Sequence, residues 1–356
     1  MISGHLADAI RLEDLPRGSP GRQRVKARIK AIPEDFEVEE VNNFEPTRDG
    51  PHIFLWVEKR DVAGGELLRR LASALGIRAA DIGYAGTKDR RAVTRQWLSV
   101  PGECERALEA GVELDGIRVL QYTRHRKKLR LGHLAGNRFR ILLRGADPAS
   151  AGDLAETGRM LEVGGFPNFY GEQRFGRSGE SLAMGLEMVE GGGRSRGRGP
   201  GRFERRMLVS AVQSALFNSY LKSRIEAGIA GTVLKGDVMT KTDTGGLFFV
   251  EDVEIEQARL DAGETRITGP MFGNRFMAAV DEAGELERGI LDRSGISAQS
   301  FDAFKRLARG TRRVLFERPG DFSATPAPDG VTVSFYLPRG TYASVLLRDF
   351  VNQSED

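Results

Sequence analysis

The feature that most constrains this chain is residues 83–96, which read GYAGTKDRRAVTRQ. Two glycines there flank a Tyr-Ala pair, which indicates a turn, because glycine lets the backbone bend where a side chain would clash. Residues 94–100 then alternate in the manner of a strand. A turn that leads into a strand can hold one carboxylate rigidly at the floor of a cleft, and we take Asp89 as that carboxylate.

Three interpretations of Asp89 follow from its neighbours. Beside Lys88, it could act as a nucleophile or a base whose negative charge the cation supports. It could also be a structural turn residue, which these few residues alone favour, because most aspartates in turns are structural. The tripeptide at 87–89 also has some likeness to the base-reading motif of GTPases, but the residue that should precede the aspartate is missing and the chain has no Gly-x4-Gly-Lys-Ser/Thr loop.

The composition is that of an ordinary globular protein, and it excludes several kinds of site. The 356 residues are 40% hydrophobic and 29% charged, which is enough for two or three domains with sizeable cores. Because there is one cysteine, Cys104, and the four histidines are scattered, we expect no disulfide framework and no metal. No signal peptide and no apolar run of membrane-spanning length is visible, which predicts a cytoplasmic protein with no membrane partner.

Hydrophobic periodicity predicts a mixture of strands and helices. Period-two alternation or β-branched runs predict strands near 25–31, 36–40, 52–57, 136–144 and 331–337. Apolar residues at helical spacing predict helices near 64–77, 149–163, 205–227 and 298–309, with another beginning near 341. Residues 231–280 have the pattern of strands and turns. After the glycine pair 164–165, the regular patterns give way to a segment rich in aromatic and polar residues.

Five segments, in this order along the chain, resemble one known family. They are PEDFEVEE at 33–40, the stretch at 83–96, GNRF at 136–139, PNFYGEQRFG at 167–176 and FYLPRGTYA at 335–343. Together they are similar to the TruD family of tRNA pseudouridine synthases, and the resemblance covers nearly the whole chain from about residue 25. The compact length looks more like the bacterial type than the longer archaeal and eukaryotic relatives.

The resemblance implies an α+β fold in two domains. One is a discontinuous pseudouridine-synthase catalytic domain, residues 1–162 and 310–356, built on a largely antiparallel mixed sheet flanked by helices. The other is an inserted α/β TRUD domain, residues 163–309. The insertion would explain why the matching segments are so widely spread, since the last of them returns to the catalytic domain.

The resemblance also implies an activity. Members of this family are isomerases (intramolecular transferases) that convert a uridine of tRNA, usually uridine 13 in the D arm, to pseudouridine without a cofactor. The aspartate of the Lys-Asp pair does the chemistry, which here is Asp89. A carboxylate suits the reaction because it can assist both the breaking of the C–N glycosidic bond and the formation of the C–C bond. Its point of attack on the substrate stays open.

Residues near Asp89 in sequence or in the matching segments are candidates for supporting roles. Lys88 and Lys30 are candidates for electrostatic support of Asp89 or of charge on the uracil. Phe36, Asn137 and Phe335 match substrate-contacting positions, where an aromatic ring can stack on an extruded base and an amide can pair with its edge. Phe139 lies on the face of Asn137 and could be a second stacking surface, although aromatic residues on amphipathic strands are more often core.

We expect tRNA to be bound through its charge. The basic run at 124–130, the arginines at 138, 140 and 144 and the Gly/Arg-rich segment at 194–206 are candidates for phosphate contacts. We expect a monomer. The alternative from another class is a non-catalytic RNA-binding or RNA-chaperone protein on the same scaffold, but such a protein would have no need of the Lys88-Asp89 pair.

Overall fold

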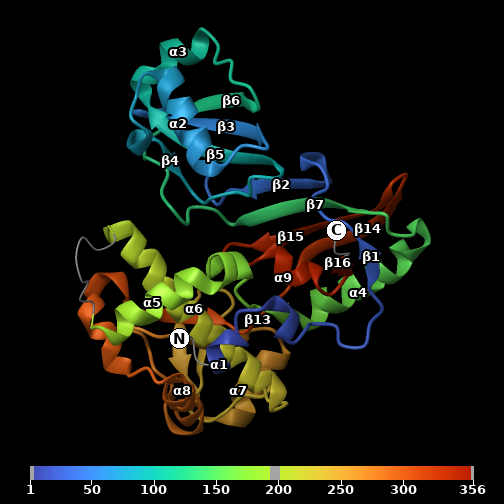
Figure 1. Ribbon diagram of the computed structural model, residues 1–356, viewed down its shortest axis with the longest axis vertical. Coiled ribbons are helices and arrows are strands. Elements are labelled where there is room, and N and C mark those ends of the chain that lie inside the picture. Colours follow the sequence, from blue (N-terminus) through green and yellow to red (C-terminus); the bar gives the residue numbers. More distant parts are fainter. Residues whose placement is uncertain (1–3, 193–200, 354–356) are drawn as a thin grey trace. The chain divides into compact units, whose positions relative to one another are not determined.

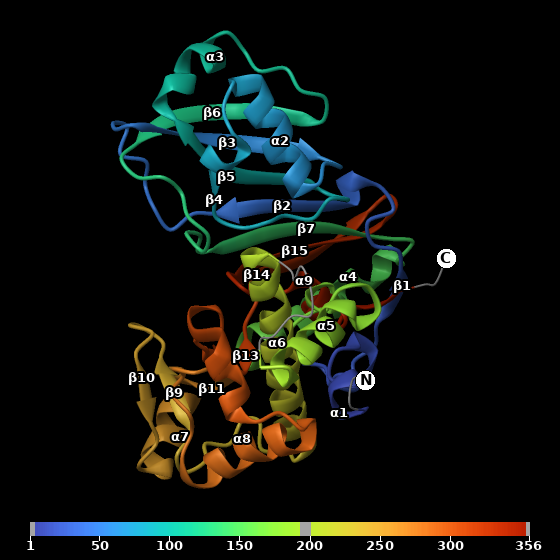
Figure 2. The same ribbon diagram turned by 60° about the vertical axis from the view of Figure 1, so that its left-hand side comes forward.

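A computed structural model of the chain describes residues 4–192 and 201–353 (Figures 1 and 2). Two compact units divide the chain. The sheet unit consists of Gly21–Gly164, Arg318–Ala343 and Leu347–Asp356, and the helix-rich unit of Met1–Pro20, Gly165–Glu317 and Ser344–Leu346. Among the described residues, no helix is both long and apolar enough to cross a membrane.

The sheet unit is built on one large mixed sheet (Figure 1). β2 and β5 run parallel, whereas the other neighbouring strands of the sheet are antiparallel. The strand β4 (Gly83–Tyr84) pairs with β5 beside the main path. That path runs in the order β14 (Gly320–Ala327), β15 (Gly330–Pro338), β7 (Gly136–Arg144), β2 (Phe36–Val41), β5 (Val93–Pro101), β3 (His52–Arg60) and β6 (Ile117–His125).

The register of this sheet places one row of side chains on a common face. Directly paired residues lie on the same side of a sheet, and the pairs run from Val57–Gln96 through Val38–Thr94 to Phe139–Phe335. We call this side the inner face. Two helices pack against the inner face: α2 (Gly64–Leu75) covers β3 and β5, and α4 (Ala151–Gly164) covers the end at β14.

Local sequence explains where these helices lie. Leu67, Leu71 and Leu75 form the buried stripe of α2 and pack against the buried residues of β3 and β5. Gly76 ends α2 in the left-handed conformation, with φ of 67°. In α4, a Cβ at Gly158 would overlap the ring of Phe322, so glycine there lets the helix approach the sheet closely.

Shorter elements complete the sheet unit. A parallel two-stranded pair joins β1 (Val25–Ala27) to β16 (Val351–Gln353). The helix α3 (Glu105–Glu109) is short, and so is α9 (Ala343–Leu347), whose residues are divided between the two units. Single 3-10 turns are formed by η2 (Pro33–Asp35), η3 (Ala79–Asp81), η4 (Gly102–Cys104) and η5 (Pro148–Ser150).

The helix-rich unit is organised around one long helix, α6 (Arg202–Glu226), whose central residues are nearly all buried (Figure 2). Around α6 lie α1 (Gly4–Ala7), α5 (Glu180–Glu190), α7 (Val253–Asp261), α8 (Asp281–Ser294) and the 3-10 segments η1 (Leu12–Asp14), η6 (Glu172–Arg174), η7 (Arg177–Gly179) and η8 (Ala298–Leu307). Its strands are β10 (Leu247–Phe249), β9 (Val238–Lys241), β11 (Thr265–Met271) and β12 (Thr311–Val314), with β8 (Phe166–Pro167) paired to β13 (Phe316–Glu317).

The compact units differ from the predicted domain boundaries, and the two largest differences have a structural cause. The strand β12 pairs with β11, so the chain leaves the helix-rich unit after Glu317 and not after residue 309. Residues 1–20 join the helix-rich unit because α1 packs on α6 and the Asn218 amide donates a hydrogen bond to the Ala9 carbonyl, 2.9 Å away. The assignment of the units as catalytic and inserted domains stays a prediction.

Most predicted elements are present, with four local differences. The predicted helix near 298–309 is the 3-10 segment η8, which is interrupted at Lys305. Residues 231–280 contain the helix α7 in addition to strands, and α5 and α8 were not predicted. Lys30 lies beyond the end of β1 and not on a strand. Residues 194–200 of the Gly/Arg-rich segment lie outside the described residues.

Candidate active site

Asp89 lies in the loop 85–92, which connects β4 to β5 and has no regular secondary structure. Gly83, at the start of this region, is required by close packing, because a Cβ there would lie 2.4 Å from both the Leu129 carbonyl oxygen and the Ser99 hydroxyl. Three contacts anchor the loop: the Gly132 amide donates to the Ala85 carbonyl, the Asp61 amide to the Ala92 carbonyl, and the Arg91 guanidinium to the Ala31 carbonyl. The loop is therefore tied to its surroundings at both ends.

The carboxylate of Asp89 lies beside Lys30. The distance from the Lys30 Nζ to the Asp89 Oδ2 is 3.4 Å, and the two side chains are 29% and 36% exposed, so the pair is open to a substrate. Lys30 has a left-handed backbone with φ of 62°, which a residue other than glycine rarely adopts. Its Nζ also lies 3.9 Å from the centre of the Phe36 ring. Strained backbone of this kind tends to occur at functional sites.

Lys88 pairs with Glu40 and not with the Asp89 carboxylate. Its Nζ lies 2.5 Å from the Glu40 Oε2, and both side chains are almost fully buried. Burial raises the pKa of the Glu40 carboxyl, against the opposing effect of the Lys88 charge. The cation that contacts the Asp89 carboxylate is thus Lys30, whereas the positive charge of Lys88 is balanced by Glu40 inside the sheet unit.

Three of the predicted substrate-binding residues form a row of rings on the inner face. Phe36 and Phe139 meet edge to face with centroids 6.0 Å apart, and Phe139 and Phe335 stack at 5.2 Å. The rings are 3%, 8% and 2% exposed for Phe36, Phe139 and Phe335. The row is therefore part of the hydrophobic core as well as a candidate stacking surface, and Phe139 is its most accessible member.

Buried polar atoms gather on the same face. Within the part of the chain that the structure describes, the Oδ1 of Asn137, the Oε1 of Glu40 and the Oγ1 of Thr94 have no hydrogen-bond partner. Asn137 pairs with Glu40 across β7 and β2, and Thr94 lies opposite Val38 on the next strand. Because buried polar atoms are nearly always hydrogen-bonded, such a group marks a place where a polar ligand could be received.

Sequence reasoning missed Lys59, whose buried ammonium lies in the same region. Its Nζ donates a hydrogen bond to the backbone carbonyl of Asp89 over 2.5 Å. Both Lys59 and Glu40 occupy inward positions of their strands: Lys59 continues the row Ile53, Leu55, Val57, and Glu40 continues the row Phe36, Val38. A charged residue in an apolar row was the signal that could have identified them.

The turn that carries Lys30 and Phe36 is held by a buried carboxylate. Asp35 is 1% exposed and accepts hydrogen bonds from Arg144 at 2.6 and 3.1 Å and from the Ile32 amide at 3.1 Å. Burial acts to raise the pKa of Asp35, but these hydrogen bonds outweigh it and leave the pKa lowered. The turn η2 is thereby fixed to β7, next to Phe139.

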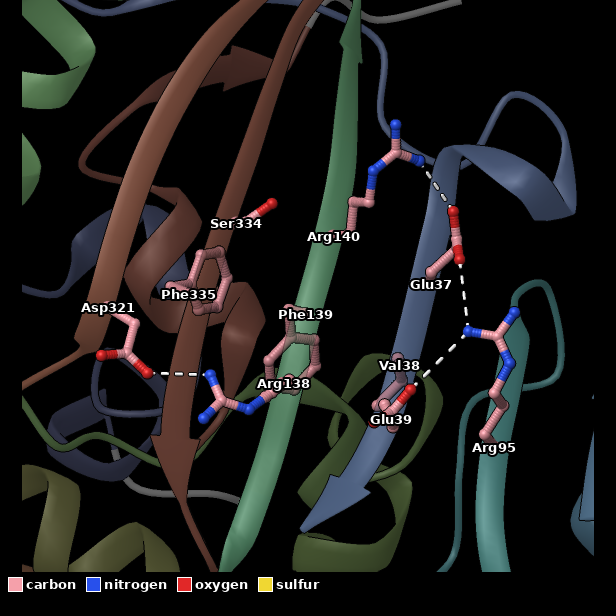
Figure 3. Close-up of a pocket in the computed structure, with 10 residues that line it drawn as sticks. All are labelled: Glu37, Val38, Glu39, Arg95, Arg138, Phe139, Arg140, Asp321, Ser334 and Phe335. Carbon is pink, nitrogen blue, oxygen red and sulfur yellow. Dashed lines mark hydrogen bonds and ion pairs between the residues drawn. The ribbon is translucent and has the colours of Figure 1, made fainter. Parts of the chain in front are cut away.

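A shallow pocket of about 260 Å³ lies on the opposite, outer face of the sheet (Figure 3). Ion pairs between charged side chains line this pocket, among them Arg138–Asp321 and Arg140–Glu37, each at 2.8 Å. Arg95 reaches both Glu37 and Glu39 (Figure 3). Asp89, Lys30 and Lys88 are not among the lining residues, whereas Phe139 and Phe335 are.

The outer-face ion pairs bear on the predicted phosphate contacts. Arg138 and Arg140 have carboxylate partners, and Arg144 is held between Asp35 and Asp329. In the basic run, Arg124 pairs with Glu105 and Arg126 with Asp49. Lys127 and Arg130 are exposed, and the described residues offer them no ion pair. These two residues are the most available for phosphate.

No group of three or more His, Cys, Asp or Glu residues in the described ranges could hold a metal ion.

Comparison with known proteins identifies the family. The model of the family described as tRNA pseudouridine synthase D (TruD) matches residues 21–195 and 203–350. The chain belongs to the TruD family. It is 43% identical over 339 residues to the tRNA pseudouridine synthase D of Anaeromyxobacter dehalogenans strain 2CP-C, which covers 94% of each chain. It is 40% identical over 327 residues to a tRNA pseudouridine synthase D of Thermus thermophilus, covering 91% of this chain and 88% of the relative.

A solved structure of the family has the same fold. The chain matches a putative tRNA pseudouridine synthase D from Methanosarcina mazei with a TM-score of 0.72 and 26% identity, over 98% of each chain. The predicted family and the predicted α+β fold class are confirmed by these matches. Family membership places the chain among isomerases that act in tRNA processing and RNA modification.

Proposed function

We propose that this chain isomerises a specific uridine of tRNA, uridine 13 in the D arm, to pseudouridine, with Asp89 as the catalytic carboxylate. The observation that carries the proposal is the half-exposed Asp89 carboxylate, 3.4 Å from the ammonium of Lys30. Lys30 in turn contacts the Phe36 ring, the first of a row of aromatic rings on the inner face, where buried polar atoms have no partner among the described residues. Family membership supports the reaction class.

The reaction explains why these residue types are needed together. The target base must leave the stack and enter a pocket, because its glycosidic bond is not accessible inside folded tRNA. Asp89 assists cleavage of the C–N bond and is regenerated when the C–C bond has formed. Lys30 would stabilise negative charge on the carboxylate or on the detached uracil. Phe139 would stack on the base, with Phe36 and Phe335 behind it, and Asn137 would pair with the uracil edge.

The domain assignment belongs to the same proposal. The sheet unit contains all of the candidate site residues and is the proposed catalytic domain, and the helix-rich unit is the proposed inserted TRUD domain. We propose tRNA as the macromolecular partner, no cofactor and no metal, a monomeric state and a cytoplasmic location.

Tritium release tests the activity. Wild-type protein should release label from tRNA that carries 5-tritiated uridine, and Asp89→Asn should not, while both bind tRNA equally in a filter assay. Asp115→Asn is the control, because Asp115 is an exposed carboxylate of the sheet unit to which the described residues offer no ion pair. Full activity in Asp89→Asn would overturn the assignment of the carboxylate.

Two further outcomes separate the finer claims. A tRNA transcript with cytidine in place of uridine 13 should release no label from the D arm, and release from another position would move the target. A wild-type protein that binds tRNA but releases no label from any tRNA would favour a non-catalytic RNA-binding or RNA-chaperone protein. The exposed Asp89 carboxylate beside Lys30 argues against that alternative, because a protein that only binds RNA would have no need of that carboxylate.

A further inference from the structure

Lys59 is a buried lysine whose one hydrogen bond goes to the backbone of the proposed catalytic residue. It lies on the inner face of β3 with a fully buried side chain. Its Nζ donates to the Asp89 carbonyl oxygen over 2.5 Å, and the described residues provide no ion pair for it. An isolated buried ammonium is costly to desolvate, so natural proteins rarely retain one without a use for it.

The interior position of the Lys59 ammonium is unfavourable for a positive charge, chiefly because the group is removed from water. Burial lowers the pKa of Lys59 from its ordinary value of 10.5 to about 8. The charged groups that face it are Asp89 and Lys88 from the loop, Asp61 after β3, and Lys30 before η2. The two aspartates favour the ammonium, and the two lysines oppose it. An apolar side chain would suit the position better, since Val57 and Leu55 precede Lys59 on the same face.

We propose that Lys59 is a positioning residue for catalysis, which fixes the Asp89 peptide and thereby the direction of the Asp89 carboxylate. This inference rests on the proposed function of Asp89. The loop 85–92 has no strand or helix to set its backbone. Its other backbone anchors are at its two ends, and Lys88 is held through its side chain by Glu40. Among the described residues, Lys59 makes the contact that holds the Asp89 peptide itself. Because a misplacement of about 1 Å can reduce a rate roughly 100-fold, an anchor at the reacting residue has a large effect on turnover.

The effect of Lys59 on the free energy of unfolding distinguishes a positioning role from a merely structural one. A structural lysine should stabilise the fold, whereas the protonated Lys59 should not. Since the folded state lowers the pKa of Lys59, the unfolded chain holds more protons than the folded chain between about pH 8 and pH 10.5. The protonated lysine therefore disfavours folding below that window, and the penalty disappears as the pH rises through it. Replacing Lys59 by an apolar residue of similar length should leave the melting temperature unchanged or raise it.

The experiment compares Lys59→Met with the wild type and with Lys26→Met, an exposed lysine on β1. Single-turnover tritium release from 5-tritiated tRNA is measured at saturating enzyme, together with tRNA affinity and melting temperature. We expect Lys59→Met to lose about 10- to 100-fold in rate, with unchanged affinity and no loss of melting temperature, and Lys26→Met to match the wild type. Lys59→Arg, which keeps a charged donor, should recover part of the rate.

The pH profile gives a readout that a structural role would not move. The wild-type rate should fall as Lys59 loses its proton near pH 8, and Lys59→Met should lack this fall. Loss of the uracil N3 proton at higher pH affects all variants alike and serves as the internal reference. A Lys59→Met rate within twofold of wild type, or a rate loss matched by a fall in melting temperature, would overturn the proposal.

Failure of the two proposals can be told apart. If Asp89→Asn is inactive and Lys59→Met is as active as the wild type, only the role of Lys59 is rejected. If Asp89→Asn keeps the wild-type rate, the proposed function of Asp89 fails, and the role of Lys59 is rejected with it.

Discussion

Arg224 and Arg312 in the helix-rich unit are held differently from Lys59 in the sheet unit, although all three cations are buried. In the helix-rich unit, Arg224 is 1% exposed and makes five hydrogen bonds through its two terminal nitrogens, two of them to Asp237. Arg312 is held in the same way by Glu287, Thr268 and the Met277 carbonyl. In the sheet unit, Lys59 makes one hydrogen bond, to a carbonyl.

This comparison shows how a cation that is buried to stabilise the fold can be distinguished from one that is buried for a role in function. A guanidinium has five donors in a fixed plane and can be satisfied on several sides at once, which suits a structural cross-link. An under-paired lysine close to a half-exposed carboxylate contributes little to the fold and is more readily explained by chemistry at that carboxylate. The following predictions test this contrast, from the largest expected effect to the smallest.

Removing the buried arginine should be far more damaging than removing the buried lysine. Arg224→Met leaves the Asp237 carboxylate buried and unpaired, so we expect a loss of about 3–5 kcal/mol in the free energy of unfolding. Lys59→Met should cost nothing or raise that free energy. Urea denaturation followed by circular dichroism measures both variants. Similar losses in the free energy of unfolding for the two variants would contradict the proposed difference between Arg224 and Lys59.

Asp35 should give an intermediate and pH-dependent effect. Asp35→Asn removes charge-assisted hydrogen bonds to Arg144 and the Ile32 amide, and we expect a loss of about 1.5–3 kcal/mol in the free energy of unfolding at neutral pH. The folded state lowers the pKa of Asp35 below its ordinary 3.8. Its stabilisation is therefore present above that value and is lost as the pH falls through the lower, folded-state pKa.

Unfolding of the wild type and Asp35→Asn at a series of pH values checks this prediction. The difference between the two should shrink as the pH drops below about 4. A difference that stays constant through the acid range would show that the carboxylate charge of Asp35 does not stabilise the fold.

The smallest predicted effect distinguishes free from paired surface cations. Changing Lys127 and Arg130 to glutamine should weaken tRNA binding and reduce the slope of log affinity against log salt by about 1.5. The matched double variant, Arg138→Gln with Arg140→Gln, should leave that slope unchanged, because both arginines are paired with carboxylates on the outer face. The exposed pairs contribute at most about 1 kcal/mol each to stability. A reduced slope in the second variant would place the outer face against tRNA.

Local periodicity was sufficient to predict the main strands and the long helices. The strand β7 spans the predicted residues 136–144, and α6 begins and ends close to the predicted limits because its apolar positions repeat without interruption. The helix α7 was missed because the stripe that would reveal it is absent: all of its residues are at least partly exposed. The helix-rich unit also contains residues 1–20, and pairing over that distance leaves no trace in local sequence.

The candidate site was only partly predictable, because its contacts join distant strands. The motifs identified Asp89, Lys30, Phe36, Asn137, Phe139 and Phe335, and the structure places all of them in the sheet unit. They did not reveal that Lys88 pairs with Glu40 and leaves Lys30 as the partner of Asp89, because adjacency in sequence says nothing of side-chain direction in an irregular loop. Likewise, the contact between Lys59 and the Asp89 carbonyl joins β3 to the loop 85–92, and the sequence does not reveal that these two segments meet.

The most direct test of the central claim is the single-turnover rate of tritium release by Asp89→Asn at saturating enzyme. With Asp89 as the catalytic carboxylate, this rate should fall by at least about 1,000-fold, with tRNA affinity and melting temperature unchanged. Asp115→Asn should remain within a few-fold of the wild type. A rate for Asp89→Asn within tenfold of the wild type would contradict the account.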